Sequence, residues 1–89
     1  MAYYKLEFSK QVVKFLDKSD HQLKIKIITA FEQLSKNPRS ASLDTKAMIN
    51  KKGHFRLRIG KYRFLYEITD TELFIYVYKA DSRGDVYKS

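Results

Sequence analysis

A concentration of basic side chains in the second half of the chain is the main chemical signal in this sequence. Between Thr45 and Tyr66 there is no Asp or Glu, and the formal charge of the whole chain is +8. The basic residues of this segment are Lys46, Lys51, Lys52, Arg56, Arg58, Lys61 and Arg63. A dense cationic strip favours binding of a polyanion, and the planar guanidinium of Arg can bond two phosphate oxygens at once. The alternative is the solvated face of a small basic protein.

Chemistry on a phosphate without a metal is easiest when the substrate is RNA, because its own 2′-hydroxyl can attack the neighbouring phosphorus. The protein must then hold the backbone, stabilise negative charge and move protons. The candidates for charge stabilisation are Arg56, Arg58, Arg63 and Arg83. Tyr87 can stack on a base, orient the phosphate or donate a proton.

A proton acceptor is harder to assign, because Arg stays protonated near neutral pH. His54 is the best candidate, since an ordinary imidazole titrates at about pH 6.5. Glu67 is the next candidate, although an interior ion pair with Arg63 is its more ordinary role.

Other kinds of site have little support in the sequence. The chain has no Cys, and its two His residues, His21 and His54, lie in unrelated segments, so we expect no metal. The three Gly residues, at positions 53, 60 and 84, form no phosphate loop, and we expect no cofactor. No segment is a signal peptide or a membrane span, so a cytoplasmic protein without a membrane partner is expected.

Elements that can position these residues follow from the apolar spacing. Alternation over residues 4–8 predicts a strand, and Ser9 can cap a helix over residues 10–17. Ser19 has the spacing of a capping box for a second helix, which ends at Asn37 before the only proline. Two helices joined by so short a turn predict a helical hairpin.

Strand patterns fill the second half of the chain. Residues 39–53 are polar and predict a loop, and the alternation over residues 55–59 and 62–68 predicts a hairpin with its turn at Gly60-Lys61. The apolar run over residues 73–80 predicts a central strand covered on both faces.

These elements make one domain, residues 1–89, because the chain is too short for a second core. The fold class is α+β: an N-terminal strand, a helical hairpin and a three-stranded antiparallel meander, with the helices on one face of the sheet. The Arg-rich side chains would meet solvent on the other face.

Three segments carry a resemblance to a known family. They are FRLRIGKYRFLYEI at residues 55–68, the strand ELFIYVYKA, and the ending SRGDVYK at residues 82–88. Together with the opening YYKLEFSKQVVKFLDK, they resemble the RelE/ParE superfamily of bacterial toxins, most closely the RelE-like messenger-RNA interferases. The resemblance implies a RelE-like fold, metal-independent cleavage of mRNA in the A site of the 70S ribosome, and a cognate antitoxin as partner.

The resemblance also implies site residues. The family's basic residues on the second strand correspond to Arg56 and Arg58, the one opening the next strand to Arg63, and the terminal pair to Arg83 and Tyr87. The best-known members have Lys on the second strand, so Arg at both positions is a departure that bears on proton abstraction. Residues expected to bind RNA or the ribosome are Lys24, Lys26, Lys51, Lys52 and Lys61.

Two other functions remain open at this stage. A ParE-like protein would share the fold and poison DNA gyrase without cleaving anything itself. A plain RNA-binding or rRNA-binding module would use the cationic strip without chemistry.

Overall fold

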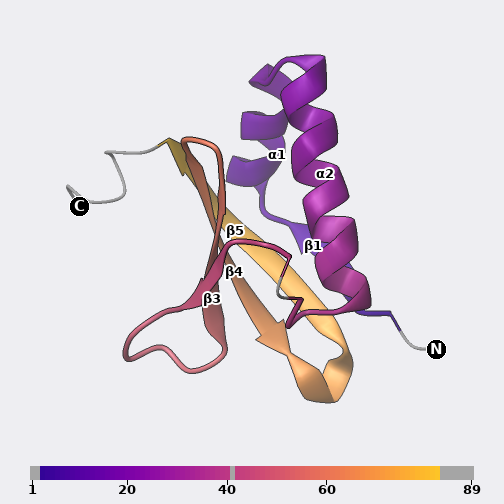
Figure 1. Ribbon diagram of the computed structural model, residues 1–89, viewed down its shortest axis with the longest axis vertical. Coiled ribbons are helices and arrows are strands. Elements are labelled where there is room, and N and C mark those ends of the chain that lie inside the picture. The colour runs from indigo at the N-terminus through magenta and orange to yellow at the C-terminus, as the bar shows by residue number, and fades with distance from the viewer. Residues whose placement is uncertain (1–2, 41, 83–89) are drawn as a thin grey trace.

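The structure is a computed structural model that describes residues 3–40 and 42–82. A strand and two helices are followed by further strands (Figure 1). The helices are α1 (Lys10–Lys18) and α2 (His21–Lys36), and the strands are β1 (Lys5–Phe8), β2 (Thr45–Ala47), β3 (His54–Ile59), β4 (Tyr62–Thr69) and β5 (Phe74–Ser82). The predicted α+β class, with a helical hairpin followed by a three-stranded meander, is confirmed.

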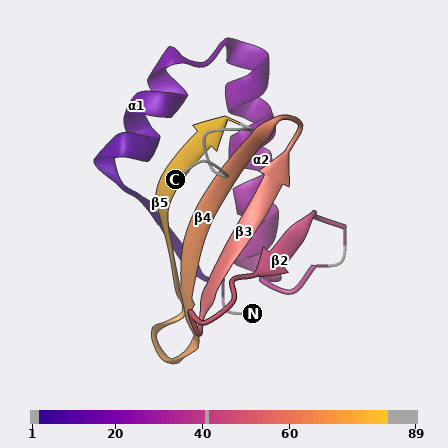
Figure 2. The same ribbon diagram turned by 90° about the vertical axis from the view of Figure 1, so that its left-hand side faces the viewer.

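The strands form one mixed sheet in the order β1-β5-β4-β3-β2. β1 pairs with β5 in parallel, and all other pairs are antiparallel. Both helices lie on the same side of this sheet (Figure 1), and the view turned by 90° shows β3, β4 and β5 with the helices behind them (Figure 2). We call the side away from the helices the open face.

The helix starts show one prediction confirmed and one wrong. The side chain of Ser9 accepts a hydrogen bond from the Val12 amide at 3.2 Å and caps α1 as predicted. The N-cap of α2 is Asp20, whose carboxylate accepts from the Leu23 amide at 2.8 Å. Ser19 instead caps the end of α1 and donates its hydroxyl to the Phe15 carbonyl. A carboxylate suits the positive end of a helix, which favours Asp20 over its neighbour.

The core lies between the helices and the sheet and is centred on Phe31 of α2. Its ring is fully buried and meets Phe8, Phe64 and Tyr66 edge-on, with ring centroids 5.6–5.9 Å apart. Edge-to-face contacts between buried rings stabilise a core beyond the area they remove from water. This packing fixes which side chains of β3 and β4 face the helices and which face outward.

The segment predicted to be a loop, residues 39–53, contains the short edge strand β2. Its register pairs Lys46 with Arg56 and Ala47 with Phe55. Three residues are too few to show an apolar alternation, so the strand left no periodic signal in the sequence.

The prediction for the last strand was half right. β5 is an interior strand of the sheet, but the helices cover only one of its faces. Ile75 and Val77 are buried against the core, whereas Tyr76 and Tyr78 are half-buried on the open face. The aromatic rings give both faces an apolar composition without both being covered. In the described part of the chain, neither helix has the length and apolar character needed to cross a bilayer.

Candidate functional site

The pleat of β3 and β4 decides which basic side chains meet. Leu57 and Ile59 are buried toward the helices, so Arg56 lies on the open face. On β4 the alternation places Arg63 and Leu65 on that same face. Leu65 is the direct cross-strand partner of Arg56, which puts the three side chains next to one another.

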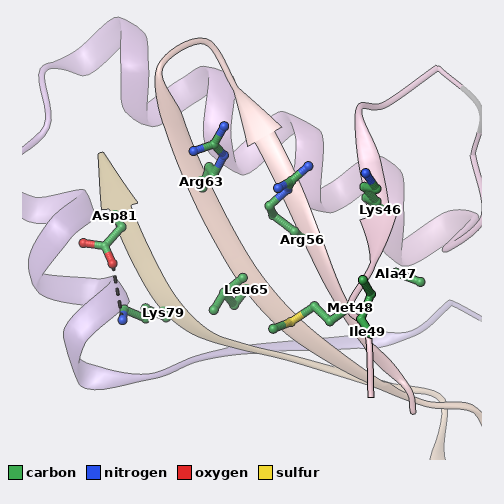
Figure 3. A pocket seen from close by; sticks show the side chains of 9 residues that line it. All are labelled: Lys46, Ala47, Met48, Ile49, Arg56, Arg63, Leu65, Lys79 and Asp81. Atoms are coloured by element: carbon green, nitrogen blue, oxygen red, sulfur yellow. Dashed lines mark ion pairs between the residues drawn. The ribbon is translucent and has the colours of Figure 1, made fainter. Parts of the chain in front are cut away.

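These side chains line a pocket of about 410 Å³ on the open face. The lining residues are Lys46, Ala47, Met48, Ile49, Arg56, Arg63, Leu65, Lys79 and Asp81. Lys46, Arg56 and Arg63 come from β2, β3 and β4, and their charged ends form a row across the three strands (Figure 3). We call this the cationic pocket.

The electrostatics of the cationic pocket favour an anion. Four of its lining residues are basic and one is acidic, and that carboxylate, of Asp81, lies 3.4 Å from the ammonium of Lys79. Arg63 is only 3% exposed. A guanidinium held so far from solvent acts through a lower dielectric than a surface Lys, so its field in the pocket is stronger.

Lys79 reaches this pocket because of an irregularity in β5. Leu65 pairs with Lys79, whereas the next residue, Tyr66, pairs with Val77. Tyr78 is therefore the extra residue of a β-bulge. Lys79 was not predicted as a site residue, and a bulge is a break in the alternation that single-sequence patterns do not show. Lys46 belonged to the basic segment but was not singled out, because the strand that carries it was missed.

Arg58 does not line the cationic pocket. Its Nε lies 3.0 Å from a carboxylate oxygen of Asp44, and both residues line a second pocket of about 510 Å³. That pocket also includes Lys26 and Gln33 of α2, so it lies at the edge of the sheet beside the helix. The structure therefore brings Arg56 and Arg63 together in the cationic pocket. Arg58 is the direct cross-strand partner of Arg63, but its side chain pairs with Asp44 and does not line this pocket.

His54 contacts two side chains on the open face. Its Nδ1 lies 3.0 Å from the Tyr78 hydroxyl, and its Nε2 lies 3.7 Å from a carboxylate oxygen of Glu67. The carboxylate of Glu67, expected beside Arg63, thus lies next to His54. Burial raises the pKa of the Tyr78 phenol, and the charge of Glu67 raises it further, so Tyr78 stays protonated at neutral pH.

The predicted RNA-binding lysines lie in the loop before β3, in the turn between β3 and β4, and on α2. Lys51, Lys52 and Lys61 are exposed, and the ammonium of Lys51 lies 5.9 Å from the ring centroid of Tyr78. On α2, Lys26 is exposed and Lys24 is half-buried.

Two predicted site residues, Arg83 and Tyr87, lie outside the described residues. Within residues 3–40 and 42–82, no three His, Cys, Asp or Glu side chains are grouped as metal ligands would be.

Comparison with protein families shows which family this chain belongs to. The family described as the ParE toxin of type II toxin-antitoxin system, parDE, matches residues 6–87. The chain is a toxin of this family. The RelE/ParE superfamily indicated by the sequence is thereby confirmed. Among curated proteins, no sequence matches the toxin.

Solved structures show the same fold over nearly the whole toxin. RelE in the archaeal RelE-RelB complex from Pyrococcus horikoshii OT3 has a TM-score of 0.82 at 24% identity, covering 92% of this chain and 97% of that one. The toxin-antitoxin complex RelBE2 from Mycobacterium tuberculosis gives a TM-score of 0.73 at 27% identity, with 96% and 97% covered. The isolated E. coli RelE toxin gives 0.74 at 18% identity, with 98% and 93% covered. The RelE-like fold is therefore confirmed.

Proposed function

We propose that this toxin is a ribosome-dependent endoribonuclease that cleaves mRNA in the A site and so inhibits translation. The observation that supports this most directly is the convergence of Arg56, Arg63 and Lys46 on one pocket of the open face. A pocket with this charge suits a phosphate of the RNA backbone. The structural likeness to RelE toxins supports the same assignment at the level of the fold.

The reaction we propose uses the 2′-hydroxyl of the substrate as the nucleophile and needs no metal. The 2′-oxygen attacks the adjacent phosphorus, the bond to the 5′-oxygen breaks, and the product carries a 2′,3′-cyclic phosphate. Arg56 and Arg63 stabilise the extra negative charge on the phosphate as it develops, because their positions are fixed by the sheet before the substrate arrives. In this proposal Arg83 stabilises the leaving oxygen, and Tyr87 positions the nucleotide.

The proton of the 2′-hydroxyl needs an acceptor, and we assign this role to His54. It lies on β3 two residues before Arg56, so both side chains project from the open face about 7 Å apart along the strand. The carboxylate of Glu67 lies 3.7 Å from its Nε2, so it faces the imidazole that receives the proton. Neither Arg of the pocket can take this role, since guanidinium does not lose its proton near neutral pH.

The basic residues outside the pocket are proposed to hold the ribosome. Lys51, Lys52 and Lys61 are exposed, and Lys26 lies at the edge with Arg58. Contacts of this kind add affinity for rRNA without selecting the cut position.

A defined mRNA mixed with the purified toxin, with and without programmed ribosomes, tests the proposal. Mapping of the new RNA ends should show cuts only when ribosomes are present, at a fixed offset in the A-site codon. Intact RNA in both samples, from a toxin that still arrests growth, would rule out the nuclease.

The second candidate function is inhibition of DNA gyrase without nuclease activity. The observation that favours it is the family match, whose description names the ParE toxin. Growth arrest with intact mRNA and with accumulation of gyrase-linked DNA breaks would establish this function instead.

We also propose that the toxin is neutralised by a cognate antitoxin. The P. horikoshii and E. coli RelE toxins have been crystallised in complexes with RelB. The cationic pocket is complementary to an acidic segment of such a partner, which would compete with RNA for the same charges.

A further inference from the structure

Three neighbouring strands contribute one side chain each to a small polar group on the open face. His54 of β3 and Glu67 of β4 are direct cross-strand partners, and Tyr78 of β5 completes the group. The imidazole Nδ1 lies 3.0 Å from the Tyr78 hydroxyl, and the two rings meet edge-on with centroids 5.6 Å apart. The imidazole Nε2 faces Glu67 at 3.7 Å. Both ring nitrogens of His54 therefore have a neighbour already.

The hydroxyl of Tyr78 has a second neighbour, which belongs to the cationic pocket. It lies 3.8 Å from the sulfur of Met48, and Met48 lines that pocket. The Met48 side chain extends from the end of β2 toward Leu65, beside Arg56 (Figure 3). A thioether is only a weak acceptor, so the single phenolic hydrogen of Tyr78 can turn to His54 Nδ1 instead. The phenolic oxygen can then accept a hydrogen bond from a substrate hydroxyl that enters the pocket.

Tyr78 does not line the cationic pocket, but its hydroxyl connects His54 to Met48, which does. We infer that Tyr78 relays the proton of the attacking 2′-hydroxyl to His54 Nδ1, and that Glu67 positions His54 to receive it. This inference rests on the proposed nuclease function. It adds Tyr78 to the residues that contact the substrate and gives Glu67 a role that acts through His54.

Each proton in this relay moves to a named atom. Before the reaction, the imidazole carries its proton on Nε2 toward Glu67, and its Nδ1 accepts the Tyr78 O–H. As the 2′-oxygen attacks phosphorus, its proton passes to the Tyr78 oxygen while the phenolic proton passes to Nδ1. The phenol is regenerated, and the imidazolium faces the Glu67 carboxylate. The 5′-oxygen leaves as its bond to phosphorus breaks and takes a proton from solvent water.

Tyr78 is suited to transfer a proton without becoming a phenolate. Burial is the main reason why its pKa is raised, and the charge of Glu67 contributes. A phenolate would therefore be unfavourable at this position, and the two proton transfers must be coupled. The ammonium of Lys51 lies over the Tyr78 ring, 5.9 Å from its centroid.

Tyr78→Phe tests the relay, because it removes the hydroxyl and keeps the ring. Single-turnover cleavage of mRNA on programmed ribosomes, at saturating toxin, should slow by about 100-fold, which is a typical contribution of general acid-base catalysis. Ribosome binding should not change. The matched control is Tyr76→Phe on the same strand and the same face, for which the rate should change by less than about twofold.

Two further readouts separate a relay from a purely structural role. Because two protons move together, the wild-type rate should depend non-linearly on the deuterium content of the solvent, and Tyr78→Phe should lose this curvature. The double variant Tyr78→Phe/His54→Gln should be no slower than His54→Gln alone, since both residues serve one transfer. Glu67→Gln should slow cleavage without weakening ribosome binding.

The outcomes distinguish this inference from the function it rests on. If Tyr78→Phe cleaves at the wild-type rate, or if the two variants slow the reaction independently, the relay is wrong while the nuclease stands. If the wild-type toxin cuts no RNA on ribosomes, the proposed function is wrong, and the relay, which depends on it, is wrong as well.

Discussion

Arg58 Nε lies 3.0 Å from the carboxylate of Asp44, an ion pair that joins β3 to the segment before β2. The backbone amide of Arg58 also donates to the Asp44 carbonyl at 2.9 Å. Arg58 is thus connected to Asp44 through both its backbone and its side chain, and it lines the pocket beside α2. Arg56, two residues earlier, lines the cationic pocket instead. Two arginines that are equivalent by sequence pattern therefore have different surroundings.

The first prediction follows from this difference. Arg56→Gln should lower the single-turnover cleavage rate on ribosomes by at least about 100-fold, because it removes a preorganised charge from the pocket. Arg58→Gln should change that rate by less than about threefold and act mainly on ribosome affinity. Mapped RNA ends and rate constants for the two variants, measured side by side, would check this. Equal losses of cleavage rate in the two variants would show that Arg58 also acts at the phosphate.

The second prediction concerns Arg63, which is almost fully buried in β4. Arg63→Met keeps most of the side-chain volume and removes the charge, so the variant should fold but fail to arrest growth. Binding of the cognate antitoxin should be nearly unchanged if this Arg contacts only RNA. Growth curves after induction, antitoxin titration and thermal unfolding of the same variant would measure the three effects. A folded Arg63→Met variant that still arrests growth would show that Arg63 is not needed for the activity.

The sequence was sufficient to predict the parts of the fold that repeat a pattern. Leu23, Ile27, Phe31 and Leu34 recur in the sequence at the spacing of one helix face, and they form the side of α2 that packs on the core. The alternation around Arg56 predicted β3 and the face that its basic side chains share. The convergence of Arg56 and Arg63 followed from the same alternation and a two-residue turn.

The parts that could not be predicted depend on single contacts between distant segments. Lys79 enters the pocket only because β5 bulges at Tyr78, and Lys46 enters it only because three residues pair with β3. The side chain of Arg58 pairs with Asp44, which lies fourteen positions away in the chain, and does not line the pocket. None of these contacts leaves a periodic trace in the sequence, since each is decided by which segment is adjacent after folding.

The third prediction concerns ribosome docking through α2. Lys26→Ala together with Lys24→Ala should weaken ribosome binding, and the loss should be largest at low salt. The slope of the logarithm of affinity against the logarithm of salt concentration should fall by roughly 1 to 2, because each phosphate contact releases a counterion. The cut position in the codon should stay the same. Binding measured by pelleting at several salt concentrations would test this, and an unchanged slope would show that α2 is not part of the docking surface.

The fourth prediction concerns stability at alkaline pH and the buried phenol of Tyr66. Burial raises its pKa to about 12, whereas an unfolded Tyr titrates at about 10. The folded state therefore favours the neutral phenol. This contribution to stability is fully present below about pH 10 and is lost as the pH rises toward 12, because the unfolded chain releases its proton first.

Tyr66→Phe removes this titration and keeps the ring that stacks on Phe55 and meets Phe31 edge-on. The free energy of unfolding of the wild type should thus fall more steeply than that of the variant between about pH 10 and 12, by up to about 1.4 kcal/mol per pH unit. Urea unfolding of both proteins at a series of pH values would measure the difference between their free energies of unfolding. The other Tyr and Lys side chains titrate in both proteins, so their contributions cancel in this difference. If the free energies of unfolding of the two proteins fell in parallel up to pH 12, water would reach the Tyr66 hydroxyl in the folded state. The packing around Tyr66 on β4 would then be looser than its complete burial indicates.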